Sequence, residues 1–253
     1  MHKILAVANQ KGGVGKTTTS VNLAASLAAT KRKVLLIDLD AQGNATTGLG
    51  VDKSELTLTA CDMLLGECSL AQATVKCPDY RLDLCPANED MTAAEVQLKD
   101  GQGGRKALKE ALATVRDDYD VILIDCPPSL SMLTVNALAA ADAVLIPMQC
   151  EYYALEGISA LVDTIGQIRQ TLNPSLQIAG ILRTMYDPRN NLARQVSAEL
   201  LSHFGDKVYR TIVPRNVRLA EAPSHGMPVI AYDARSTGSK AYIALAGEIL
   251  RKK

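Results

Sequence analysis

The chain has 253 residues, 47% of them hydrophobic, and its 27 Lys+Arg balance its 27 Asp+Glu to a net charge of zero. A chain of this length and apolar content can bury a full core, so we expect residues 1–253 to form a single domain. Zero net charge alone argues against a nucleic-acid-binding protein, and without a signal peptide or an apolar run of roughly 18 residues we expect a cytoplasmic protein with no membrane partner.

Apolar runs and helical patterns alternate along the chain. We expect strands at 3–9, 33–38, 82–86, 121–125, 143–148, 177–184 and 207–213. We expect helices at 17–29, 104–115, 131–140, 154–171, 192–204 and 240–251. The alternation predicts an α/β fold with a mainly parallel, twisted sheet and helices on both of its faces. Segment 41–80 has the least regular pattern, and 100–104 has the composition of a glycine-rich surface loop.

The six cysteines form no C-x-x-C pair, and the chain has three histidines. This pattern argues against a metal site made by cysteine and histidine. In a reducing cytosol such cysteines are expected to be small, buried hydrophobic residues without disulfides.

A glycine-rich loop follows the first predicted strand and precedes the first predicted helix. Glycines let consecutive amides approach a phosphate, a lysine neutralises the β and γ charge, and a hydroxyl ligates Mg²⁺. A glycine cluster can also be only a turn, but the strand-loop-helix context favours a P-loop. The residues expected to bind nucleotide here are Lys11, Gly12, Gly13, Val14, Gly15, Lys16, Thr17 and Thr18. The strict motif has glycine at position 10, whereas this chain has Gln10 and adds Lys11.

Acidic residues follow two of the predicted strands, and ligands of such sheets bind at these carboxyl ends. Asp38 ends strand 33–38 and Asp40 follows it, where they either cap a turn or act beside a triphosphate. We favour a catalytic role for Asp40 in orienting the attacking water. Asp125 ends the apolar strand 121–125 in the Walker B manner, so we assign Thr17 and Asp125 to the Mg²⁺ shell.

The strand end at 184–191 lies where many P-loop proteins recognise the base. It lacks the N-K-x-D motif that a GTPase would carry. We therefore expect adenine, with ATP and Mg²⁺ as the bound species.

These motifs together resemble the ParA/Soj group of deviant Walker A ATPases, which includes MinD. The resemblance rests on residues 11–18, 38–44, 125–129, 149–157 and 214–224, spread over nearly the whole chain. The family usually has proline after the second switch aspartate, where this chain has Ala41. The difference loosens the loop but removes no chemical group.

The resemblance implies a P-loop NTPase that sandwiches ATP between two protomers. Lys11 would reach across to the partner's phosphates, which makes it catalytic together with Lys16 and Asp40. Gly12 would face the other protomer, where a side chain could not fit. Pro214 and Asn216 match the positions at which the family contacts adenine.

The family also binds double-stranded DNA without sequence preference, and a ParB-like partner stimulates its hydrolysis. The charge distribution agrees with this, because residues 183–253 hold 12 Lys+Arg against 6 Asp+Glu, whereas residues 1–182 hold 15 against 21. We assign Arg189, Arg215 and Arg218 to DNA. Solvated helix faces or surface ion pairs would account equally for these arginines.

Three other functional hypotheses share parts of this pattern. A membrane-cycling MinD-like ATPase would need an amphipathic C-terminal helix, whereas segment 241–250 has the pattern of a helix packed on the core. An iron–sulfur reductase would need bridging cysteines, for which Cys126 and Cys150 are the candidates, but the glycine-rich cluster loop is missing. A ParA-like ATPase that positions a protein cargo stays open, because its adaptor would touch surface residues without a motif. We therefore predict a cytoplasmic, nucleoid-associated ATPase that drives chromosome or plasmid segregation.

Overall fold

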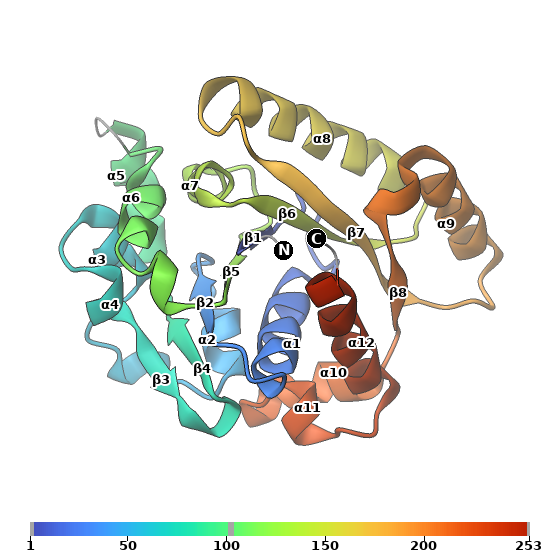
Figure 1. Ribbon diagram of the computed structural model, residues 1–253, viewed down its shortest axis with the longest axis horizontal. Helices are drawn as coiled ribbons and strands as arrows, with labels where there is room; N and C mark the ends of the chain where they lie inside the picture. The colour runs from blue at the N-terminus through green and yellow to red at the C-terminus, as the bar shows by residue number, and fades with distance from the viewer. Residues whose placement is uncertain (1–2, 101–103, 252–253) are drawn as a thin grey trace.

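The computed structural model describes residues 3–100 and 104–251 of the chain. Its eight-stranded sheet has the order β3-β4-β2-β5-β1-β6-β7-β8 (Figure 1). Neighbouring strands pair in parallel throughout, except for β3, which is antiparallel to β4 at one edge. The strands are β1 (Ile4–Val7), β2 (Val34–Asp38), β3 (Val75–Cys77), β4 (Leu82–Cys85), β5 (Val121–Asp125), β6 (Ala143–Gln149), β7 (Gln177–Tyr186) and β8 (Val208–Pro214). The predicted fold class is confirmed.

Helices cover both faces of this sheet (Figure 1). One face packs against α1, α2, α11 and α12, and the other against α3 and α5 to α9. The helices are α1 (Lys16–Ala29), α2 (Asn44–Gly48), α3 (Ala60–Leu65), α4 (Leu70–Ala73), α5 (Met91–Asp100), α6 (Ala107–Ala113), α7 (Met132–Ala140), α8 (Ala154–Thr171), α9 (Asn191–Phe204), α10 (Val217–Glu221), α11 (Val229–Tyr232) and α12 (Thr237–Arg251). Among the described residues, none of the helices combines the length and apolar character needed to cross a membrane.

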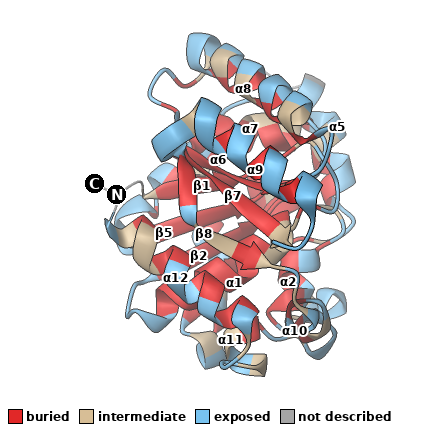
Figure 2. Cartoon of the chain, turned by 90° about the vertical axis from the view of Figure 1, so that its right-hand side faces the viewer, coloured by how far each residue is buried: buried red, intermediate tan, exposed pale blue. Residues whose placement is uncertain are grey.

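The central strands are buried on both faces, as Figure 2 shows in red. Successive side chains of a strand point to opposite faces, so each strand contributes to two cores. In β1, Ile4 and Ala6 join the core under α7 and α8, whereas Leu5 and Val7 join the core under α1 and α12. This two-sided burial explains why these strands read as unbroken apolar runs in the sequence.

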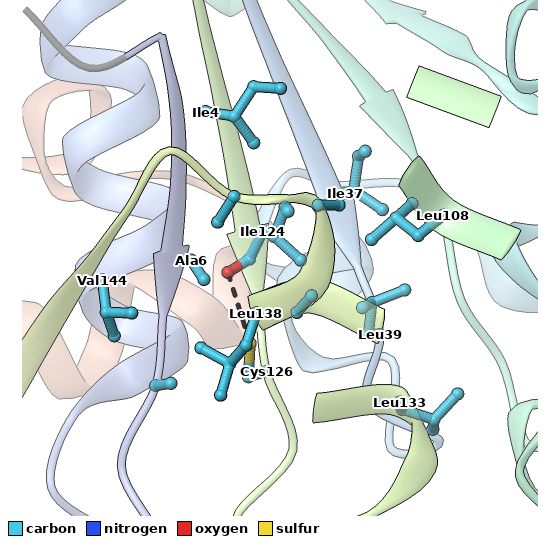
Figure 3. Close-up of a cluster of buried hydrophobic side chains, with 14 of the residues drawn as sticks. Ile4, Ala6, Ile37, Leu39, Leu108, Ile124, Cys126, Leu133, Leu138 and Val144 are labelled. Carbon is cyan, nitrogen blue, oxygen red and sulfur yellow. Dashed lines mark hydrogen bonds between the residues drawn. The ribbon is translucent and has the colours of Figure 1, made fainter. Parts of the chain in front are cut away.

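Cys126 follows β5 and lies in the first of these cores, beside Ile124 (Figure 3). Its thiol contacts the Ile124 carbonyl oxygen at 3.8 Å and packs among apolar side chains that include Leu133 and Leu138 of α7. All six cysteines are free, and all but the half-buried Cys68 are buried. They behave as the small hydrophobic residues that the sequence predicts.

Some predicted boundaries are wrong. The helix expected at 104–115 is α6, which is shorter (Ala107–Ala113), and α12 begins at Thr237 instead of 240. Asp100, expected in a loop, ends α5, a helix that the sequence analysis missed; 101–103 lie outside the described residues. Segment 41–80, expected to be least regular, contains only short elements such as α3, α4 and β3.

Two tight contacts complete the fold. Glu248 of α12 accepts hydrogen bonds from the backbone amides of Arg210 and Thr211 in the edge strand β8, at 2.8 and 3.0 Å. Gly50 and Gly226 both have positive φ, and a Cβ on Gly226 would lie 2.7 Å from the Gly50 Cα. This backbone contact joins the turn after α2 to the turn before α11.

Candidate nucleotide site

The loops after β1, β2 and β5 meet at one edge of the sheet. These strands are adjacent, and their register pairs Asp125 of β5 with Val7 on one side and Asp38 on the other. Because parallel strands end at the same edge, the loop after Val7 and the two aspartates come together there. The structure therefore brings the two predicted acidic strand ends beside the predicted phosphate loop.

The loop after β1 has the backbone shape that its glycines permit. Gly13 and Gly15 have φ angles of 72° and 85°, which residues with a Cβ rarely adopt. Helix α1 begins at Lys16 without any side-chain cap, so its first amides are open to an anion. The Lys16 ammonium donates to the Lys11 carbonyl oxygen at 3.0 Å and so folds back over the loop. Burial lowers the pKa of Lys16, while the charge of Asp125 raises it.

Two residues that the sequence analysis did not single out hold this loop in place. Asn9 accepts a hydrogen bond from the Lys11 amide at 3.0 Å and donates to the Pro147 carbonyl at 2.7 Å. Thr184, at the end of β7, donates to the Val14 carbonyl at 2.8 Å. The loop is therefore fixed to β6 through Pro147 and to β7 through Thr184.

Lys11 and Gly12 lie at the exposed front of the loop. The Lys11 ammonium forms an ion pair with Glu151, in the loop after β6, at 2.5 Å. Gly12 has no atom within 4 Å of the place where a Cβ would lie, among the residues described. Within residues 3–100 and 104–251, no contact therefore requires glycine at this position.

Asp125 is fully buried beneath the loop. Ser20 of α1 donates to Asp125 Oδ1 at 2.7 Å, and Oδ2 has no hydrogen-bond partner in the described part of the chain. Burial and the neighbouring charge of Asp38 raise the pKa of Asp125, and the hydroxyls of Ser20 and Thr17 lower it. An unpaired buried carboxylate oxygen near Thr17 fits the ligand shell of a hard cation, so these residues suit Mg²⁺.

Asp38 and Asp40 have different surroundings. Asp38 is fully buried and accepts from the amides of Asp40 and Thr46, at 3.1 and 2.9 Å, which matches the turn-capping alternative for this residue. Asp40 is partly exposed, and its carboxylate accepts from the Gln42 amide at 3.0 Å. The Asp40 charge also raises the pKa of Lys16, although burial lowers it more.

A cavity of about 200 Å³ adjoins the loop at Gly15 and Thr18. Pro214 and Asn216, the predicted adenine contacts, lie on its wall together with apolar side chains that include Leu219. Asn216 is held in place because it donates to the Thr237 hydroxyl at 2.8 Å and accepts from the Leu219 amide. The structure thus brings these two residues to the phosphate loop, although almost 200 positions separate them from it in the chain.

The three arginines assigned to DNA are exposed, and two are ion-paired. Arg189 pairs with Asp187 at 2.8 Å. Arg218 pairs with Glu221 at 2.8 Å and with Asp233 at 3.4 Å. Arg215 lines both the 200 Å³ cavity and a neighbouring cavity of about 160 Å³.

This site defines a P-loop ATPase with a second lysine in its loop. Its features are a parallel sheet covered by helices on both faces, a glycine-rich loop before α1 and the buried Asp125.

A family model described as an AAA domain matches residues 2–178. The chain is 50% identical over 255 residues to the chromosome partitioning protein ParA of Caulobacter vibrioides, covering 99% of this chain and 95% of the relative. It is 51% identical over 249 residues to the sporulation initiation inhibitor protein Soj of Bacillus subtilis, covering 98% of each. The chain belongs to the ParA/Soj family of chromosome-partitioning ATPases.

The fold similarity extends over the whole molecule. The crystal structure of cobyrinic acid a,c-diamide synthase from Mycobacterium smegmatis, with bound ADP and magnesium, has a TM-score of 0.87 to this chain at 39% identity. The match covers 99% of this chain and 95% of that one.

Proposed function

We propose that ATP joins two copies of this chain into a sandwich dimer that binds DNA without sequence preference and segregates chromosomes or plasmids. A ParB-like partner would stimulate hydrolysis and release the dimer. The observation that carries the proposal is the exposed front of the phosphate loop. Lys11 and Gly12 face outward there, and the open space at Gly12 is explained once a second protomer packs against it.

The site residues divide into three roles. Lys16 binds the β and γ phosphates in its own chain, and Lys11 supplies a second cation to the phosphates of the partner. Thr17 and Asp125 hold Mg²⁺, which would neutralise charge on the phosphate oxygens. Asp40 orients the attacking water. The proposal is supported by the magnesium and ADP bound to the Mycobacterium smegmatis neighbour.

The base would enter the 200 Å³ cavity beside Gly15 and Thr18. Adenine would then lie against Pro214 and Asn216, on a wall that continues directly from the phosphate loop. This continuity supports ATP as the nucleotide.

The DNA surface is proposed to include Arg189, Arg215 and Arg218. Two of these pair with carboxylates in the free chain, so DNA phosphates would have to replace those partners. Exposed pairs of this kind contribute little to stability because solvent screens them, so the exchange costs little. We also propose that residues 1–253 act as one domain in the cytoplasm, associated with the nucleoid.

The direct test is binding of the purified protein to unrelated duplex DNA in ADP, in ATP and without nucleotide, across a salt series. We expect binding in ATP alone, equal affinity for unrelated sequences, and an affinity that falls steeply with salt. Arg218→Glu should abolish DNA binding and leave ATP-driven dimerisation intact. Equal DNA binding in ADP and ATP, or no binding in any state, would refute the proposal.

A further inference from the structure

Asp38 lies at the centre of the site, and the roles proposed above leave it unused. It is fully buried at the end of β2 and pairs in register with Asp125. Its Oδ1 accepts a hydrogen bond from the Asp40 amide at 3.1 Å. Asp38 therefore fixes the backbone of the residue proposed to orient water, and the position of Asp40 depends on how Asp38 is held.

Thr46, in α2, holds the other oxygen of Asp38. The amide and the hydroxyl of Thr46 both donate to Asp38 Oδ2, each at 2.9 Å. The same hydroxyl accepts a hydrogen bond from the Ala87 amide at 2.9 Å. Because Thr46 is fully buried, loss of its hydroxyl would leave polar groups without partners. One hydroxyl thus joins the end of β2, helix α2 and the residues after β4.

The loop between Asp40 and α2 also contacts Ala87. Gly43 has a φ of +57°, and a Cβ there would lie 2.5 Å from the Ala87 carbonyl oxygen. The Gly43 amide donates to the Asp40 carbonyl at 2.8 Å. Ala87 therefore contacts both the Thr46 hydroxyl and the glycine that closes the Asp40 loop, so displacement of one is transmitted to the other.

We propose that Thr46 is a positioning residue for ATP hydrolysis, acting through Asp38 on the backbone of Asp40. The inference rests on the proposed role of Asp40. The hydrogen bonds of the Thr46 side chain go to Asp38 and Ala87, and neither is part of the phosphate loop. Release of the Asp40 backbone should therefore slow hydrolysis while nucleotide binding is retained, since small displacements of a positioned group reduce rate strongly.

The experiment compares Thr46→Val, Thr46→Ser and Thr47→Val in the intact chain. Valine keeps the shape of threonine without its hydroxyl, and serine keeps the hydroxyl. Thr47 is the matched control, because it is the next residue of α2 and its hydroxyl donates to the Gly43 carbonyl, at 3.2 Å, instead of to Asp38. The readouts are single-turnover hydrolysis of Mg·ATP, the dissociation constant of a fluorescent ATP analogue and the unfolding temperature.

We expect Thr46→Val to lower the hydrolysis rate about tenfold and to change nucleotide affinity by less than about twofold. Thr46→Ser and Thr47→Val should stay within about twofold of the unchanged chain in both hydrolysis rate and nucleotide affinity. An unchanged rate in Thr46→Val, or a parallel loss of nucleotide affinity, would overturn the inference. If the valine variant does not fold, Thr46→Ala replaces it with the same expectations, because alanine leaves the Asp38 carboxylate uncrowded.

Asp40→Ala separates this inference from the proposed function. Unchanged hydrolysis in Asp40→Ala would refute the role of Asp40 itself. If hydrolysis falls, adding Thr46→Val to Asp40→Ala should cause no further loss, because the side chain that Thr46 positions is absent. A further tenfold loss in the double variant would overturn the role of Thr46 and leave that of Asp40 intact.

Discussion

Lys11 is ion-paired with Glu151 of its own chain, with 2.5 Å between Nζ and Oε2. The side chains are 43% and 49% exposed, so the pair contributes at most about 1 kcal/mol. If Lys11 is to reach the phosphates of a second protomer, this pair must break. Glu151 would therefore oppose the proposed dimerisation by a small amount.

Glu151→Gln should strengthen ATP-driven dimerisation by up to about fivefold, because it removes the competing carboxylate. Sedimentation velocity in ATP, with Asp40→Ala present in every sample to prevent hydrolysis, measures the effect. Glu156→Gln is the matched control, since this glutamate is also exposed and lies in α8. A weaker dimer in Glu151→Gln would contradict the prediction and show that the Glu151 carboxylate stabilises the dimer.

Lys16→Ala should weaken ATP binding at least about 100-fold. Charge-assisted hydrogen bonds contribute about 1.5–3 kcal/mol each, and the role proposed for Lys16 gives it two of them, with the β and γ phosphates. Titration with a fluorescent ATP analogue measures the loss, and Lys109→Ala, an exposed lysine of α6, provides the control. Affinity within threefold of the unchanged chain would contradict the assignment of the phosphate loop.

The stability of the nucleotide-free protein should fall as the pH rises from about 4 to about 8. Burial and the charge of Asp38 raise the pKa of Asp125 from 3.8 to about 8. Between these values the folded chain holds a proton at Asp125 that the unfolded chain releases, so the free energy of unfolding decreases with pH. We expect the unfolding temperature to drop by a few degrees between pH 5.5 and pH 8.5.

Asp125→Asn should flatten this pH dependence and raise the unfolding temperature at pH 8.5. Asp163→Asn, in the exposed part of α8, should leave the dependence unchanged. Mg·ADP should also flatten it, because a bound cation favours the ionised carboxylate, and chelation of the metal should restore it. If the unfolding temperature of Asp125→Asn falls with pH as steeply as that of the unchanged chain, other titratable groups cause the pH dependence.

Gly226→Ala should destabilise the fold by about 2–4 kcal/mol, because a Cβ there would collide with the backbone of Gly50 and φ is positive. Thermal unfolding should show a decrease of roughly 5–15 °C. Gly166→Ala is the control and should stabilise the fold. This glycine lies within α8, no atom of the residues described comes within 4 Å of its Cβ position, and alanine favours the helix. A neutral Gly226→Ala would show that the two turns separate readily.

The central strands could be predicted because burial on both faces leaves unbroken apolar runs, as in β5 (Val121–Asp125). β3 (Val75–Cys77) could not be predicted, because it has only three residues, Lys76 is exposed and its stability comes from pairing with β4. α5 (Met91–Asp100) was missed although its buried residues Met91, Ala94 and Leu98 have the i, i+3, i+7 spacing of a helix. An element such as β3, which depends on its neighbours, leaves little trace in its own residues.

The candidate site shows the same difference between features set by local sequence and features set by distant contacts. The positions of Lys16 at the start of α1 and of Asp125 at the end of β5 could be predicted because a local motif surrounds each of them. The contacts of Asn9 with Pro147, Lys11 with Glu151 and Thr184 with Val14 join residues 138, 140 and 170 positions apart. Their partners are known only once the strand order is known. The motif thus predicts which groups meet the phosphates, but not what holds those groups in place.

The hydrogen bonds from the β8 amides of Arg210 and Thr211 to Glu248 have a further consequence for copies of this chain at high concentration. An open edge strand offers its amides to any other strand and so promotes aggregation. Here a carboxylate of the same chain already occupies two of those amides, and β3 at the opposite edge is only three residues long. Copies crowded together would have to break internal hydrogen bonds before their sheets could merge, so crowding favours separate molecules over a continuous β-fibre.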